Sequence, residues 1–221
     1  MGSDKQKEPK VRQRVRIRFS KQGDLRLIGH RDLLRLLERL FRRADLRLGM
    51  SEGFHPKPRM SFPWALAVGI EGRDELMELE LAERYSAEEL IELLNAHIVP
   101  GLEFLSVQIM PETGKIVRSQ VNAVDYQIAI PSERQEEALQ KVKWLMDQST
   151  LMVERPRHSG TLDLRPYLEY LEFSNGQLYF RMKVTRQANP GPRDVLTAIG
   201  LEDIETRPGS CLVRTKVHAV P

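Results

Sequence analysis

Apolar residues recur along the chain at two spacings, and these spacings predict both strands and helices. Residues 11–19, VRQRVRIRF, alternate apolar and arginine positions, and a period of two predicts a strand with one buried face. The other face would be open and would carry three arginines: Arg14, Arg16 and Arg18. Residues 30–44 carry leucines at helical spacing, so we expect an amphipathic helix there.

The order of predicted elements occurs twice. Residues 76–81 alternate again, with Glu78 and Glu80 predicted to point outward, and Ser86 opens a helix in a capping-box pattern. With a short strand at residues 47–50, a strand at residues 101–109 would complete the order strand, helix, strand, strand, helix, strand. The second half is expected to contain a strand at 122–130, a helix at 132–148, a strand-like segment at 151–155, a hairpin at 168–184 around Asn175-Gly176, a helix at 192–199 and a strand at 211–220.

This repeated order predicts an α+β protein built from two tandem ferredoxin-like (βαββαβ) domains with antiparallel sheets. The expected divisions are a disordered lead-in at 1–10, a basic N-terminal domain at 11–110, a linker at 111–121 and a C-terminal domain at 122–221. The linker carries Pro111 and Gly114, which interrupt regular structure.

The modest net charge of +3 conceals an uneven distribution. Residues 1–60 hold 17 Lys or Arg against 7 Asp or Glu, whereas residues 71–110 hold 2 against 10. A basic end beside an acidic one favours a polyanionic partner on one face, and nucleic acid is the commonest such partner. Solvated helix faces with a chance imbalance of charge are the alternative explanation.

Two segments concentrate the candidate chemistry. The helix at 30–44 carries a cationic stripe, and like charges four residues apart lower helix stability unless an anion binds them. The loop at 51–59, SEGFHPKPR, contains two prolines that restrict its shape, and it is either a binding element or a connecting loop. The residues expected to contact nucleic acid are Arg14, Arg16, Arg18, Arg31, Arg35, Arg39, Arg42, Arg43, Phe54, His55, Lys57 and Arg59.

Signals for other classes of function are weak. The single cysteine, Cys211, is compatible with a reducing cytoplasm, and no apolar run reaches the roughly 18 residues of a membrane-spanning helix. The histidines lack metal-ligand spacing, so we expect neither a metal nor another cofactor. His30, at a helix start, is a weak candidate for a catalytic base, although capping or packing is the commoner role.

Residues Phe19–Leu81 resemble the bacterial family of radical-SAM-linked proteins, a domain of otherwise unknown function. The loop Ser-x-Gly-Phe-x-Pro-x-Pro is the most specific part of this resemblance, and Thr161–Phe173, TLDLRPYLEYLEF, also resembles the family. The positions that match the family pattern are His30, Asp32, Arg42, Arg43, Ser51, Gly53, Phe54, Pro56, Pro58 and Gly69.

The resemblance implies association with a radical SAM enzyme. The iron–sulfur cluster of such an enzyme needs three cysteines and this chain has one, so the radical chemistry would belong to the partner. The expected function is therefore a non-catalytic RNA-binding accessory protein that presents RNA to that enzyme or to another RNA-processing partner. One alternative is a protein-interaction module that docks on the enzyme without nucleic acid. The expected fold is also similar to that of the tandem ferredoxin-like endoribonucleases of CRISPR repeat processing, so a metal-independent endoribonuclease that uses His30 is the other alternative.

Overall fold

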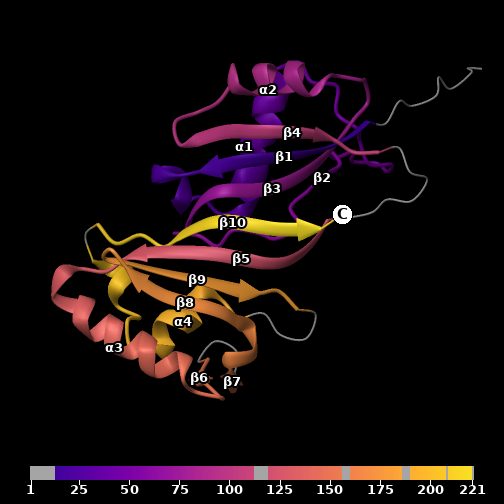
Figure 1. Ribbon diagram of the computed structural model, residues 1–221. Coiled ribbons are helices and arrows are strands. Elements are labelled where there is room, and N and C mark those ends of the chain that lie inside the picture. The colour runs from indigo at the N-terminus through magenta and orange to yellow at the C-terminus, as the bar shows by residue number, and fades with distance from the viewer. Residues whose placement is uncertain (1–12, 112–118, 156–159, 186–189, 208, 221) are drawn as a thin grey trace, which may run out of the picture. The chain divides into compact units, whose positions relative to one another are not determined.

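The computed structural model describes residues 13–111, 119–155, 160–185, 190–207 and 209–220. It shows a mixed α+β protein in which antiparallel strand pairs dominate, as the fold class predicted (Figure 1). The chain divides into two compact units: unit 1 comprises Met1–Ala65 and Glu75–Arg118, and unit 2 comprises Leu66–Asp74 and Ser119–Pro221. The predicted lead-in at 1–10 and most of the predicted linker at 111–121 lie outside the described residues.

Unit 1 contains strands in the order β4-β1-β3-β2, with two helices between them in sequence. The β1–β4 and β2–β3 pairs are antiparallel. Its elements are β1 (Gln13–Lys21), the 3-10 helix η1 (Gly23–Leu27), α1 (His30–Arg43), β2 (Met60–Ser61), β3 (Glu71–Leu81, whose first residues belong to unit 2), α2 (Ala87–Asn95) and β4 (Leu102–Ile109).

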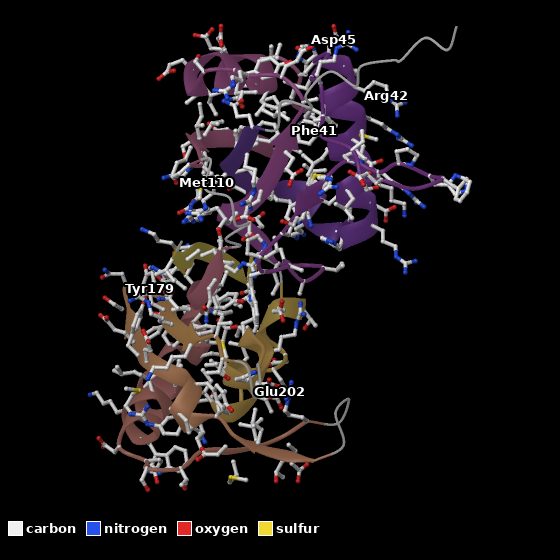
Figure 2. The ribbon with its side chains drawn as sticks, turned by 90° about the vertical axis from the view of Figure 1, so that its right-hand side faces the viewer. Phe41, Arg42, Asp45, Met110, Tyr179 and Glu202 are labelled. Atoms are coloured by element: carbon white, nitrogen blue, oxygen red, sulfur yellow. The ribbon has the colours of Figure 1, made fainter. Side chains whose placement is uncertain are left out.

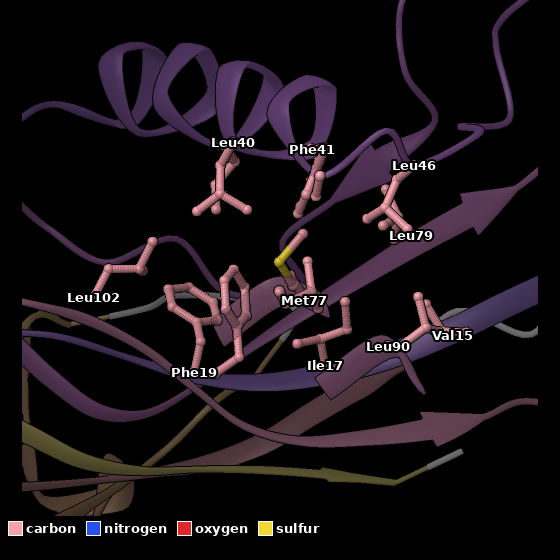
Figure 3. Close-up of a cluster of buried hydrophobic side chains, with 14 of the residues drawn as sticks. Val15, Ile17, Phe19, Leu40, Phe41, Leu46, Met77, Leu79, Leu90 and Leu102 are labelled. Carbon is pink, nitrogen blue, oxygen red and sulfur yellow. The ribbon is translucent and has the colours of Figure 1, made fainter. Parts of the chain in front are cut away.

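The core of unit 1 lies between the sheet and the two helices (Figure 3). Helix α1 contributes apolar side chains at helical spacing, among them Leu37 and Phe41, which are fully buried. Strand β1 contributes its alternate residues, such as Ile17, and β3 contributes Met77. Because the buried face of β1 contacts α1, the arginines at the intervening positions of β1 point to the opposite face of the sheet.

Local signals set the helix starts in unit 1. The Ser86 hydroxyl accepts a hydrogen bond from the backbone N–H of Glu89, and the Glu89 carboxylate accepts one from the Ser86 N–H, so α2 begins with the predicted capping box. Glu78 on β3 points away from the α1 side of the sheet, as predicted, but it is buried there and faces Arg14 and Arg16 rather than solvent.

Unit 2 contains strands in the order β10-β5-β9-β8. The β5–β9, β8–β9 and β10–β5 pairs are antiparallel, while β10 also pairs in parallel with Glu71 and Gly72. Its elements are β5 (Gln120–Ala129), η2 (Ser132–Arg134), α3 (Gln135–Met146), β6 (Met152–Glu154), β7 (Thr161–Asp163), η3 (Arg165–Tyr167), β8 (Leu168–Ser174), β9 (Gln177–Lys183), α4 (Pro192–Ala198), η4 (Ile204–Thr206) and β10 (Val213–Val220).

The predicted β8–β9 hairpin is confirmed. Asn175 and Gly176 at its tip both have positive φ values, 51° and 72°, which is the backbone shape of a two-residue type I′ turn. Strands β6 and β7 form a separate two-stranded sheet, and the sequence pattern did not predict β7. Among the described residues, no helix combines the length and the apolar character needed to cross a bilayer.

Candidate nucleic-acid interface

Helix α1 presents its cationic stripe to solvent. The helix starts at His30 after Gly29, and its buried leucines turn the opposite side outward, so Arg31, Arg35, Arg39, Arg42 and Arg43 are all exposed. Figure 2 shows Arg42 on the outer side of α1, whereas Phe41 lies on the side toward the sheet. The exposed face of α1 is therefore basic along the whole helix.

Few protein groups neutralise this stripe. The Arg35 Nη1 lies 3.4 Å from the Asp32 Oδ1, but both side chains are more than 60% exposed, and such pairs contribute little. Arg43 donates a hydrogen bond to the carbonyl of His97 rather than to a carboxylate. Within the described part of the chain, no ion pair or hydrogen bond engages the side chain of Arg31, Arg39 or Arg42.

The loop that joins α1 to β2 is held by backbone hydrogen bonds. The Gly49 N–H donates to the carbonyl of Glu80 at 2.8 Å, and the Arg59 N–H donates to the carbonyl of Gly49 at 2.8 Å. A side chain on Gly49 would place Cβ 2.8 Å from the Cβ of Glu80, so only glycine permits this close approach. Nearer the tip, the Ser51 N–H donates to the Lys57 carbonyl, and the Lys57 N–H donates to the Ser51 hydroxyl.

A groove of about 940 Å³ lies between α1 and this loop. Its charged lining consists of Arg31, Arg35, Glu38, Arg42, Arg47 and Lys57, and we call it the arginine groove. The described residues that line the groove thus include five cationic side chains and one carboxylate. Two ion pairs among the described residues engage this lining, Arg47 with Glu83 at 3.9 Å and Arg35 with Asp32 at 3.4 Å, and all four side chains are solvent-exposed. The groove therefore has a strongly positive lining that is open to an anion.

A second, smaller groove of about 650 Å³ runs along the other side of α1. Arg39 and Arg43 line it, and Arg35 and Arg42 border both grooves. Asp32 is the one carboxylate among the described residues of its lining. The two grooves place cations on both flanks of a single helix.

The structure does not bring the arginines of β1 together with those of α1. They lie on the sheet face opposite α1, where Arg14 and Arg16 face Glu78 at 3.4 and 3.8 Å. The predicted open face is wrong for Arg16, because only 10% of this side chain is exposed. Arg18 is half-buried. The carboxylate of Glu78 on β3 pairs with Arg14 and Arg16, so the more exposed α1 stripe and the loop are the stronger anion site.

The two candidate histidines occupy different surroundings. The His30 ring packs edge-to-face against Phe62, with 5.3 Å between ring centroids, and Phe62 packs in the same way on Phe19. This contact supports a packing role for His30 at the helix start. His55 is exposed in the loop beside Phe54. No group of three His, Cys, Asp or Glu side chains that could hold a metal occurs among the described residues.

Arg59, which was predicted to contact nucleic acid, is held by groups of the loop and of β3. Its Nε donates a hydrogen bond to the Met50 carbonyl at 3.1 Å and lies 3.6 Å from the Glu80 Oε2. Arg59 therefore fastens the base of the loop, and Lys57 is the loop cation that lines the arginine groove. Arg47 also lines the groove. The sequence did not indicate this residue because it follows the end of α1 and lies outside the helical repeat of arginines.

The Leu-Asp-Leu-Arg-Pro segment in unit 2 has a structural explanation. The Asp163 carboxylate accepts hydrogen bonds from the backbone N–H groups of Leu151 and Arg165, at 2.7 and 3.1 Å. Arg165 donates to the carbonyls of Gln148 and Leu168 at 3.2 and 3.0 Å. Each residue satisfies backbone groups of the loop, so this part of the family pattern fixes local structure.

A charged cluster in unit 2 was not predicted. The Asp125 carboxylate on β5 accepts a two-pronged hydrogen bond from Arg181, with 2.9 Å between Nη2 and Oδ2, and it contacts His218 Nε2 at 2.8 Å. Burial acts to raise the pKa of Asp125, but hydrogen bonds from Arg181 and His218 outweigh burial and hold that pKa below its usual value. The three groups come from three adjacent strands and crosslink them.

The fold and this surface define a mixed α+β protein with a basic, anion-attracting face on unit 1. The chain belongs to a bacterial family described as "Uncharacterized protein conserved in bacteria (DUF2344)", whose pattern matches residues 14–193. This membership confirms the predicted bacterial family of unknown function, whereas the link to a radical SAM enzyme stays a prediction.

Other comparisons add little. No curated protein matches the chain. Solved structures similar to it include an unknown protein from Galdieria sulphuraria, with 14% identity and a TM-score of 0.30 over 96% of this chain and 100% of that chain. A likeness at that level carries no argument about function.

Proposed function

We propose that the protein is a non-catalytic RNA-binding accessory protein that holds the RNA backbone in the arginine groove of unit 1. The observation that carries this proposal is the lining of the groove, with five cations and one carboxylate. Phosphate groups are the natural partners of such a lining, since arginine and lysine bind phosphate and release its counterions.

The arrangement of α1 supports a polyanion rather than a small anion. Arginines four residues apart along a helix are separated by a rise of roughly 6 Å, and the stripe extends through all 14 residues of α1. Their mutual repulsion costs a few tenths of a kcal/mol per pair in the free protein. An extended chain of phosphates would relieve that repulsion at several points together.

We further propose that both units are ferredoxin-like. Strand order supports this assignment, because β4-β1-β3-β2 in unit 1 and β10-β5-β9-β8 in unit 2 both follow the pattern fourth, first, third, second. In unit 2 the two central strands, β5 and β9, are antiparallel, as that fold requires. The β6–β7 sheet would be an insertion between the first helix and the second strand.

A partner enzyme would supply the chemistry. The single cysteine cannot hold an iron–sulfur cluster, so any radical SAM chemistry would belong to the partner enzyme. Another RNA-processing enzyme is the alternative partner. The cytoplasm is the proposed location. A protein-interaction module without nucleic acid is the second candidate, and the exposed Phe54 side chain is the observation that favours it.

The test is binding of the purified chain to fluorescently labelled RNA, together with a His30→Ala variant. The proposal predicts binding that weakens steeply with salt, no cleavage of the RNA, and unchanged affinity in His30→Ala. Cleavage that His30→Ala abolishes, with binding intact, would establish the endoribonuclease instead. Failure to bind RNA at low salt would refute the proposal and favour the protein-interaction module.

A further inference from the structure

The aromatic ring of Phe54 is the most exposed large apolar side chain among the described residues. Its relative exposure is 103%, whereas the other phenylalanines are buried or half-buried. A fully exposed phenylalanine forgoes the free energy of burying its ring, which a ligand that covers the ring would recover. The loop therefore presents a ring without a partner in the described chain.

The loop holds this ring in a restricted position. Reciprocal hydrogen bonds between Ser51 and Lys57 close the segment on either side of Phe54, at 2.8 and 2.9 Å. Pro56 fixes the backbone on the C-terminal side of the ring, and Gly53 has a φ of 146°, which side chains rarely adopt. A loop fixed in this way loses little conformational entropy when it binds.

The loop that carries the Phe54 ring also lines the arginine groove. Pro56, Lys57 and Pro58, two to four residues after Phe54, line the arginine groove together with α1 arginines. Aromatic rings beside a positively charged groove are the combination with which proteins bind single-stranded nucleic acid, because bases stack on the rings while phosphates follow the groove. His55, also exposed, adds a second ring at the tip of the loop.

A duplex would leave this aromatic ring without a partner. Bases inside a duplex are already stacked, and the major groove of A-form RNA is too deep and narrow for side chains to read. Away from the ends of a duplex, only an unpaired base exposes a face on which the Phe54 ring can stack. The ring thus distinguishes between two forms of RNA that the cations alone would treat alike.

We infer that the site selects single-stranded RNA, with phosphates in the arginine groove and an unpaired base stacked on Phe54. This inference rests on the proposed function and names its substrate class. The stacked base is not specified by sequence, because every base offers a π face.

The experiment compares an unstructured labelled RNA with the blunt duplex of the same sequence, for the wild-type chain and three variants. Phe54→Ala removes the ring, Phe54→Trp keeps an aromatic, and Trp144→Ala removes another exposed aromatic, on α3 of unit 2. We expect tighter binding of the single strand, and a loss of about 5- to 150-fold in Phe54→Ala with no change in salt dependence. Phe54→Trp should retain affinity, and Trp144→Ala should match the wild type.

The outcomes separate the two proposals. Equal affinity for single strand and duplex, with Phe54→Ala unchanged, overturns the single-strand inference and leaves RNA binding by the groove intact. Absence of binding to either RNA overturns both. An equal loss in Trp144→Ala would also overturn the inference, since it would show that exposed aromatics contribute without regard to position.

Discussion

Charge removal from the arginine groove should flatten the salt dependence of RNA binding. The variant Arg31/Arg35/Arg42→Gln removes three of the five cations that line the groove and leaves Arg47 and Lys57. These three side chains are exposed and do not contribute to the core, so the variant should fold. The change therefore isolates the contribution of charge.

The magnitude follows from the number of cations. Each phosphate contact with a single strand contributes about 0.7 to the slope of log affinity against log salt, so five contacts give a slope of about −3.5 and two give about −1.4. Between about 50 and 200 mM salt, the wild-type affinity should then fall about 130-fold and that of the variant about 7-fold.

Fluorescence anisotropy of a labelled single-stranded RNA measures both slopes. The matched control, Lys141/Lys143/Lys183→Gln, removes the same charge from exposed positions of unit 2. It should keep the wild-type slope. A slope that is equally reduced in both variants would refute the reasoning, because it would show that net charge alone, rather than the groove, determines binding.

Three further predictions concern the stability of the two units, the first two of unit 1 and the third of unit 2. Phe41→Ala, at a fully buried position against Phe104, should lower the free energy of unfolding by about 3–5 kcal/mol in a denaturant titration. Asn95→Ala removes both hydrogen bonds of the Asn95 amide to the Phe104 backbone, and it should destabilise unit 1 by about 1–3 kcal/mol in the same assay. Asp125→Asn should lower stability at neutral pH, because a carboxyl whose folded pKa is depressed stabilises the fold above its unfolded pKa of about 4. That difference from the wild type should shrink as pH falls through the folded pKa of Asp125, which thermal melts over a pH series would record.

Each of these predictions has a contrary result. A Phe41→Ala variant as stable as the wild type would show that α1 does not pack as described. An Asn95→Ala variant within a few tenths of a kcal/mol of the wild type would show that water replaces both hydrogen bonds. A stability difference for Asp125→Asn that persists unchanged into acid would show that the carboxylate charge contributes nothing.

Helical and strand periodicity predicted the main elements well because it records which side of each element is buried. Leu33, Leu37 and Leu40 fall on the core side of α1, as their spacing indicates, and the arginines face outward. The turn at Asn175-Gly176 was equally predictable, since few residue pairs adopt positive φ twice in succession.

The arginine groove was only half predictable, because it is assembled from segments distant in sequence. Lys57 reaches the α1 arginines because hydrogen bonds attach Gly49 and Arg59 to the Glu80 backbone, a contact across about 30 residues that no local pattern encodes. The partial burial of the β1 arginines was not predictable for the same reason. Alternation shows that Arg16 leaves the core, but it does not reveal that Glu78 on another strand meets it.

Ultraviolet crosslinking of the purified protein to bound RNA tests the central claim most directly. Mass spectrometry of the crosslinked peptides would locate the contacts in the sequence without any variant. The account predicts crosslinks within residues 30–59, in α1 and in the loop that carries Phe54. Crosslinks confined to unit 2, or none at all under low-salt conditions, would contradict it.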